Sequence, residues 1–596
     1  MRGFLLVFFM ALTSFSALAQ QASLADNYVD HGEYTKAEAI YKQLYKQQPN
    51  AFNYLKSLVM VLQEQRKYDA AASYLKDFAD RHPSYPGIYV EIGYNYQRQN
   101  QPNKAEEFYA KALNRVTERP SYAYRIGEAF QDYSLLKKAE KAYQSALKEN
   151  YTPNLSIRLA RVYGEQAKFE QMFATFLDLI AAQQQYYTSV RNDFARYVNS
   201  NPENKANKIL RKLLMKRLQQ QPDVFYNRML SWLFVQENRF EMAFVQERAV
   251  YIRSQYKSLS YIIRLANLAA DKQQYESAEK ILNFAVEHAQ TTAQEIYVYH
   301  QLMAIKLKQA KPEDYPQIDQ QFQDLFKRFG NDMSTAKLQV QYADFLAFTQ
   351  HKTAAAKAVL NALLNYDMRD FEKARLKMKL ADILVAEENF NQALIYYSQI
   401  TGLAEHSPLA QEARFKVAKT SYYKGDFDWA QTQLKILKEA TSELTANDAI
   451  ALNLLIEENT AADSTQTALK LFAKADLFSV QGKVAAALTV LDSILTDYRE
   501  DNIVDQALLR SAKLYERQAA YQKAVDAYQT LIADFKDGIL VDDAYYYLAE
   551  LYRTTLNQPE KAKEAYKQII FHHADSIFYV AAQKAFRKLR GDVYDD

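Results

Sequence analysis

Residues 93–112 read GYNYQRQNQPNKAEEFYAKA. Gly93 and Tyr96 are three residues apart, and Ala105 and Tyr109 are four residues apart, so each pair lies on one face of a helix. A small residue lets two helix axes approach closely, and a neighbouring aromatic ring fills the space beside it. This stretch therefore predicts two helices joined by a turn.

The same pattern returns with a period of about 34 residues, as the interval from Pro49 to Pro83 illustrates. Self-similarity at a fixed period is typical of repeat architectures, in which each unit buries its apolar face against the next. The sequence therefore predicts an all-α chain, an α-solenoid of stacked helix-turn-helix repeats with roughly 12 to 14 helix pairs. Further repeat positions expected to pack internally are Ala25, Tyr28, Ala37, Tyr41, Gly127, Ala139, Tyr143, Ala524 and Tyr528.

This alternation of small and aromatic residues, with a closing proline, resembles the tetratricopeptide repeat (TPR) family. The resemblance covers most of the chain after residue 19. It implies a scaffold whose first helices line a groove for an extended or helical segment of a partner protein. Polar first-helix residues expected in that groove are Asn27, Asn95, Arg125, Asn267 and Arg510.

The pattern also predicts segments within the chain. It fades at residues 181–225, 290–333 and 441–467, which we interpret as atypical repeats at segment borders. Functional loops are the competing interpretation of these stretches. The expected segments are an N-terminal TPR array (20–180), atypical helical repeats (181–333), a middle array (334–470) and a C-terminal array with 37-residue spacing (471–596).

The C-terminal repeats carry a more specific resemblance. The runs 491–498, 505–515 and 531–552 resemble repeats of outer-membrane assembly lipoproteins and of Tol-Pal-associated TPR proteins. The chain departs from those lipoproteins because it has no cysteine to lipidate. As a whole, it is similar to long TPR proteins of the Bacteroidota cell envelope. These resemblances imply partner proteins in the envelope.

Residues 1–19 predict a cleaved secretory signal peptide, with Arg2 at its start, an apolar run over residues 4–18 and the cleavage pattern Ala17-Leu18-Ala19. A membrane anchor is the alternative for this run, although it is shorter than a typical span. No later run is long enough to predict a transmembrane segment in the mature chain. We expect a protein of the periplasm or of the periplasmic face of the outer membrane, with peripheral membrane association as an option.

The composition excludes several kinds of chemistry. The net charge is +3, with 74 basic and 71 acidic residues, so no strong field favours nucleic acid. The absence of cysteine excludes disulfides, thiolate metal sites and a cysteine nucleophile. His572 and His573 are adjacent, and adjacent helix residues point about 100° apart, which does not suit one metal ion. The sequence predicts no catalytic residue, cofactor site or metal site.

One local charge feature stands out. Residues 205–217 form an amphipathic basic pattern in which lysines and arginines alternate with leucines. Contact with a membrane surface or an acidic partner is one interpretation, and the solvated face of a solenoid helix is the other.

These observations predict a non-enzymatic protein–protein interaction scaffold of the cell envelope. The alternative is a structural subunit of an outer-membrane assembly or secretion machine. An enzyme acting on envelope polymers is a third possibility, but no pair of catalytic groups with workable spacing supports it.

Overall fold

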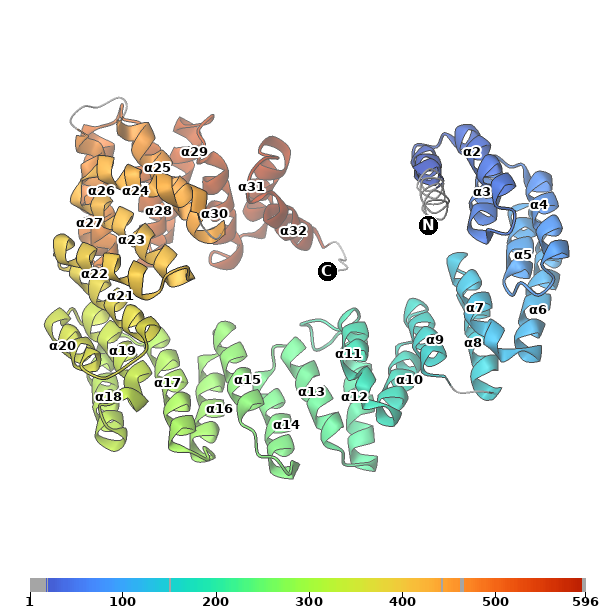
Figure 1. Ribbon diagram of the computed structural model, residues 1–596, viewed down its shortest axis with the longest axis horizontal. Coiled ribbons are helices and arrows are strands. Elements are labelled where there is room, and N and C mark those ends of the chain that lie inside the picture. Colours follow the sequence, from blue (N-terminus) through green and yellow to red (C-terminus); the bar gives the residue numbers. More distant parts are fainter. Residues whose placement is uncertain (1–17, 19, 150–151, 441–442, 461–465, 592–596) are drawn as a thin grey trace, which may run out of the picture. The chain divides into compact units, whose positions relative to one another are not determined.

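The computed structural model describes residue 18 and residues 20–149, 152–440, 443–460 and 466–591 (Figure 1). Regular structure in these residues is helical, and they contain no strand. The all-α prediction is therefore confirmed. The predicted signal peptide lies almost entirely outside the described residues. None of the described helices is long and apolar enough to cross a membrane.

The chain divides into two compact units, of which the first ends at Tyr256 and the second begins at Lys257. In the first unit, a helix over residues 20–30 precedes thirteen labelled helices. Their bounds are α2 Tyr34–Gln47, α3 Phe52–Glu64, α4 Tyr68–Arg81, α5 Ile88–Arg98, α6 Pro102–Glu118, α7 Ala123–Asp132, α8 Leu136–Glu149, α9 Pro153–Glu165, α10 Phe169–Ala182, α11 Tyr187–Ala195, α12 Lys205–Gln220, α13 Val224–Gln236 and α14 Phe240–Arg253.

The second unit continues the series of helices. A π-helical turn over Phe345–Thr349 extends α19. The bounds are α15 Ser260–Asp271, α16 Tyr275–Glu287, α17 Thr292–Gln309, α18 Tyr315–Phe329, α19 Ala336–Asp344, α20 Thr353–Leu364, α21 Asp370–Ala386, α22 Phe390–Leu403, α23 Pro408–Lys424, α24 Phe427–Ala440, α25 Glu443–Thr460, α26 Thr467–Val480, α27 Val484–Asp497, α28 Val504–Arg517, α29 Tyr521–Asp534, α30 Val541–Thr554, α31 Pro559–His572 and α32 Tyr579–Arg590.

Successive helices form pairs, such as α5 with α6 and α28 with α29. The described residues of the stretches where the sequence pattern fades are mostly helical as well. The helices α11 and α12 lie in the first of them, where α12 packs against α10 and α13. The helices α17 and α18 lie in the second, and α25 lies in the third as an additional helix against α24. The division into five predicted segments stays a prediction.

The turns inside the pairs share a backbone conformation. Gly32, Arg66, Asn100 and Ser134, each one repeat period from the next, have positive φ angles of 74°, 61°, 58° and 56°. At Asn100, the following amide nitrogen, that of Gln101, donates back to the carbonyl of Tyr96 at 3.0 Å. This hydrogen bond satisfies a carbonyl at the helix end and reverses the chain sharply.

Large buried rings beside small residues hold each pair together. A β-carbon at Gly93 would lie 2.6 Å from the Tyr109 ring, so only glycine allows this approach. The Tyr109 ring is 1% exposed, and its hydroxyl donates to Gln97 Oε1 at 2.8 Å. Burial of such a ring is favourable because its polar tip keeps a partner. Ala25, Ala37, Tyr41, Ala105, Gly127, Ala139, Tyr143, Ala524 and Tyr528 are also buried.

Three predicted repeat positions are more exposed than these. Tyr28 and Tyr96 are half-buried, and lysine ammonium groups lie over their rings at 5.1 Å and 5.4 Å from the ring centroids. Pro49 is exposed in the turn after α2. Its role is to end the helix, because proline cannot continue the pattern of helical hydrogen bonds.

Candidate partner-binding surface

We call the outward side chains of the first helices of the pairs the first-helix surface. In both units, polar contacts on this surface join residues that lie one repeat apart in the sequence. Arg98 of α5 donates to Glu64 of α3 at 2.9 Å, and the two residues are 34 positions apart. Lys416 of α23 donates to Asp382 of α21 at 2.6 Å across the same interval. Each of these contacts joins one first helix to the next.

Aromatic rings paired with arginines are exposed on the same helices. The Arg158 guanidinium of α9 lies 3.8 Å from the centroid of the Tyr124 ring on α7, and Tyr124 is 40% exposed. Similar pairs occur on α15, where Arg264 lies over Tyr261, and on α21, where Arg375 lies over Phe371. Tyrosine and arginine are enriched at protein interfaces, since the ring offers a large, rigid contact area and the guanidinium offers five hydrogen-bond donors.

The five predicted groove residues lie on five different helices. Asn27 is exposed in the helix over residues 20–30. Arg125 of α7 follows Tyr124, and its side chain is 66% exposed with one long contact, 3.5 Å, to Glu128. Asn267 of α15 is half-buried.

Asn95 of α5 is only 1% exposed. Its amide nitrogen donates to the carbonyl of Tyr68 at 3.1 Å, and its amide oxygen accepts from Gln63 at 3.2 Å. These contacts join α5 to α3 and α4. The side chain of Asn95 is therefore not available to a partner on the surface.

Arg510 of α28 belongs to a buried charge cluster. Its Nε lies 3.1 Å from Oδ1 of Asp476 on α26, and the Tyr422 hydroxyl donates to Oδ2 at 3.3 Å. Burial raises the pKa of Asp476, and the positive charges of Arg510 and Lys419 oppose that shift. Burial also lowers the pKa of Lys419. The sequence argument did not identify Asp476 or Lys419, although Asp476 lies 34 positions before Arg510, the same interval that separates the polar contacts between other first helices.

A second buried acid lies on α5. Burial raises the pKa of Glu91 to about 7, against an ordinary value of 4.5. The Tyr133 hydroxyl donates to its carboxylate, and the Tyr133 ring stacks on Tyr94 with the centroids 3.7 Å apart. No sequence pattern marked Glu91, because its burial depends on a neighbouring repeat.

Within the described ranges, no group of three or more His, Cys, Asp or Glu side chains is arranged to hold a metal ion. His572 lies in the last turn of α31, and His573 follows that helix.

Models described as tetratricopeptide repeat match residues 23–86 and 56–123, and again residues 506–538 and 543–576. No curated protein matches the chain at a significant level. The first-unit matches cover the helices from residue 23 to the start of α7, and the C-terminal matches cover most of α28 to α31.

Several solved structures are similar at low identity. They include the Cut9–Hcn1 hetero-tetramer of APC/C, at 12% identity with a TM-score of 0.24, covering 90% of this chain and 96% of that one. Naa15/Naa10 bound to HypK-THB matches at 12% identity with a TM-score of 0.30, over 97% and 94% of the two chains. The P58(IPK) TPR domain matches at 11% with a TM-score of 0.18, over 79% and 97%. Scores of this size carry no argument about partners or function. The helix pairs at residues 23–123, 506–538 and 543–576 therefore match the tetratricopeptide repeat.

Proposed function

We propose that this chain is an exported, non-enzymatic scaffold of the bacterial cell envelope that binds segments of partner proteins on its first-helix surface. Tetratricopeptide repeats generally mediate protein–protein interaction. The observation that carries the proposal is the set of exposed arginine–aromatic pairs on first helices of both units, at Tyr124, Tyr261 and Phe371. Such side chains supply much of the binding energy in known interfaces.

The envelope location rests on the sequence of residues 1–19 and on the absence of cysteine. Signal-peptide cleavage near Gln20 would release the chain into the periplasm, where it can associate with the outer membrane through its partners. Cell fractionation and mass spectrometry of the mature N-terminus test this location. A mature protein that retains residues 1–19 in the cytoplasmic fraction would contradict it.

A structural subunit of an outer-membrane assembly or secretion machine is the second candidate. The resemblance of the C-terminal repeats to envelope assembly proteins favours it. In that case the first-helix surface would hold one permanent partner in a fixed ratio, whereas an adaptor would bind several partners transiently.

Crosslinking of a tagged copy in its own cell envelope, followed by mass spectrometry, tests the scaffold proposal. Arg125→Glu should reduce partner capture without changing the melting temperature, because Arg125 is exposed beside Tyr124 and makes only one long ion pair. The matched control is the exposed pair Lys137→Glu and Lys141→Glu on the second helix α8. Equal capture by Arg125→Glu and the unchanged protein would count against the first-helix surface as the binding site.

A further inference from the structure

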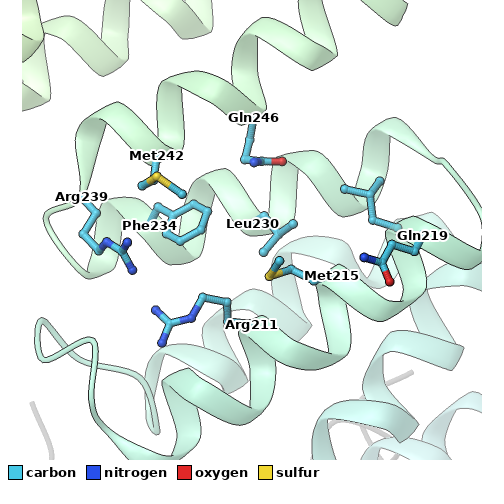
Figure 2. A pocket seen from close by; sticks show the side chains of 9 residues that line it. Arg211, Met215, Gln219, Leu230, Phe234, Arg239, Met242 and Gln246 are labelled. Atoms are coloured by element: carbon cyan, nitrogen blue, oxygen red, sulfur yellow. The ribbon is translucent and has the colours of Figure 1, made fainter.

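A groove with an apolar floor lies between α12, α13 and α14 of the first unit (Figure 2). Its volume is about 360 Å³. Leu230 and Phe234 of α13 line it and are 1% and 3% exposed, whereas Met215 of α12 and Met242 of α14 are 50% and 40% exposed. We call it the methionine groove. The two methionines come from α12 and α14, and the α13 side chains at the floor are buried, so the groove is separate from the exposed side chains of the first-helix surface.

The charge at one end of the groove is positive. The Arg211 guanidinium donates to both carboxylate oxygens of Glu237 at 2.9 Å, and Arg239 lies 3.5 Å from the same carboxylate. The Glu237 side chain is fully buried, so one enclosed negative charge is flanked by two positive ones. The Arg239 side chain remains 39% exposed at the groove. An approaching carboxylate would therefore meet an excess of positive charge.

The outer face of α12 extends this positive charge. Lys212 and Lys216 are exposed, and in the part of the chain that the structure describes neither forms an ion pair. Lys208 is paired with Glu203 at 2.5 Å. These lysines line a further hollow of about 420 Å³ along α12, which shares Arg211, Met215 and Gln219 with the methionine groove. The apolar floor and the basic rim are thus continuous.

We propose that the methionine groove binds an acidic amphipathic helix of a partner protein. Apolar side chains one turn apart on such a helix would insert between Met215 and Met242, and acidic side chains beside them would face Lys212, Lys216 and Arg239. Methionine suits this role because its flexible, polarisable side chain adapts to different apolar partners. A helix in an apolar groove is a recurrent mode of peptide recognition, and opposite charges set its orientation and specificity.

The shape of the groove favours a peptide over a membrane surface. A protein that lies on a bilayer inserts protruding apolar side chains between the lipid headgroups. Here the most buried apolar side chains, Leu230 and Phe234, lie at the bottom of a hollow, and the exposed methionines Met215 and Met242 stand at its sides. A bilayer cannot reach into such a hollow, but a row of side chains on a helix can.

Fluorescence anisotropy with the full chain tests this proposal. The probe is a fluorescein-labelled amphipathic peptide with leucines on one face and glutamates beside them, and the comparison peptide has lysines in place of the glutamates. The acidic peptide should bind at least about tenfold more tightly than the basic one. The double variant Lys212→Glu/Lys216→Glu should reverse this preference, whereas Lys137→Glu/Lys141→Glu on α8 should leave it unchanged.

A second pair of variants tests the apolar part. Met215→Gln/Met242→Gln should weaken binding of the acidic peptide at least about tenfold. The matched control, Ile395→Gln/Ile436→Gln, changes two exposed apolar side chains on α22 and α24 and should have no effect. Circular dichroism melting curves check that every variant folds.

Three outcomes would overturn the proposal. The first is that the acidic peptide does not bind with a Kd of about 1 mM or below. The second is that the acidic and basic peptides bind equally well. The third is that the acidic peptide binds the lysine double variant and the methionine double variant as tightly as the unchanged protein. Binding of the chain to phosphatidylglycerol vesicles without peptide binding would assign the basic face to a membrane instead. Arg125→Glu should leave peptide binding intact, so failure of the first-helix proposal and failure of this one are distinguishable.

Discussion

The Tyr143 ring occupies the space beside Gly127 so fully that a β-carbon on Gly127 would lie 2.3 Å from the ring carbon Cε1. Tyr143 is fully buried, and its hydroxyl donates to Gln131 at 2.8 Å, so the ring has no room to move. Gly127→Ala should therefore destabilise the protein by about 1–3 kcal/mol, measured as a lower melting temperature. Gly402→Ala on α22 is the control, because nothing lies within 4 Å of its new β-carbon. An unchanged melting temperature for Gly127→Ala would contradict this account of the packing.

The left-handed turn residues predict a stabilising substitution. Ala519, after α28, has a φ of 56° and is exposed. A β-carbon in this conformation costs about 1–2 kcal/mol, and the greater freedom of glycine in the unfolded chain offsets part of that cost. Ala519→Gly should therefore raise stability by up to about 1 kcal/mol in urea denaturation. Ala358→Gly, in the middle of α20, should lower it by a similar amount, since a helix interior disfavours glycine. A loss of stability for Ala519→Gly would be inconsistent with the turn conformation.

Glu91 predicts a dependence of stability on pH. Its pKa in the folded protein is about 7, above the ordinary value of 4.5, so the folded state holds this proton more tightly than the unfolded state. The protonated carboxyl of Glu91 stabilises the folded protein fully at a pH below 4.5. This contribution is lost as the pH rises through about 7. The free energy of unfolding should fall by roughly 3 kcal/mol at most over this pH range.

Melting temperatures of the unchanged protein and of Glu91→Gln, measured between about pH 5 and pH 8, test this. Glutamine keeps an acceptor for Tyr133 but does not titrate, so the variant should lose less stability over this range. The exposed Glu118→Gln on α6 should behave like the unchanged protein. Parallel pH profiles for Glu91→Gln and the unchanged protein would rule out this role for Glu91.

Replacement by alanine should destabilise the protein more at Arg510 than at Arg125. Removing one partner of a buried ion pair leaves an uncompensated charge, which costs about 3–5 kcal/mol in fully buried cases. Because the Arg510 side chain is 40% exposed, we expect Arg510→Ala to cost about 2–3 kcal/mol in urea denaturation. Arg125→Ala should cost less than about 1 kcal/mol, since exposed ion pairs contribute little. Asp476→Asn in the Arg510→Ala background should restore part of the lost stability. Equal effects of the two arginine substitutions would refute the buried-cluster assignment.

The helical class and the pairing of helices could be predicted from the sequence because each repeat encodes them locally. Small and aromatic residues three or four positions apart indicate which face of a helix meets its own partner helix. They do not indicate the contacts between repeats. Asn95 illustrates this limit, because it points away from the α5–α6 interface but toward α3, where Gln63 contacts it.

The backbone conformation of the turns and the methionine groove could not be predicted from the sequence, for different reasons. Gly32 marks a left-handed residue, but Arg66 and Ser134 adopt the same conformation without any residue preference that would reveal it. The basic face of α12 was visible in the sequence, whereas the apolar floor beneath it was not. That floor comes from α13, and it exists only because two second helices leave Leu230 and Phe234 at the bottom of a gap.

The contacts that recur with the repeat also bear on how such a chain can change its length. Tyr109 meets Gln97, and Tyr143 meets Gln131 in the same way one period further along. If residues 97–130 were removed, Gln131 would directly follow Tyr96 and retain its hydrogen bond to Tyr143. Duplication or loss of one whole period within residues 88–149 therefore preserves this kind of contact inside each helix pair. The contact between Glu91 and Tyr133, which joins two repeats, would be lost, so a change in length requires adjustment between the repeats rather than within them.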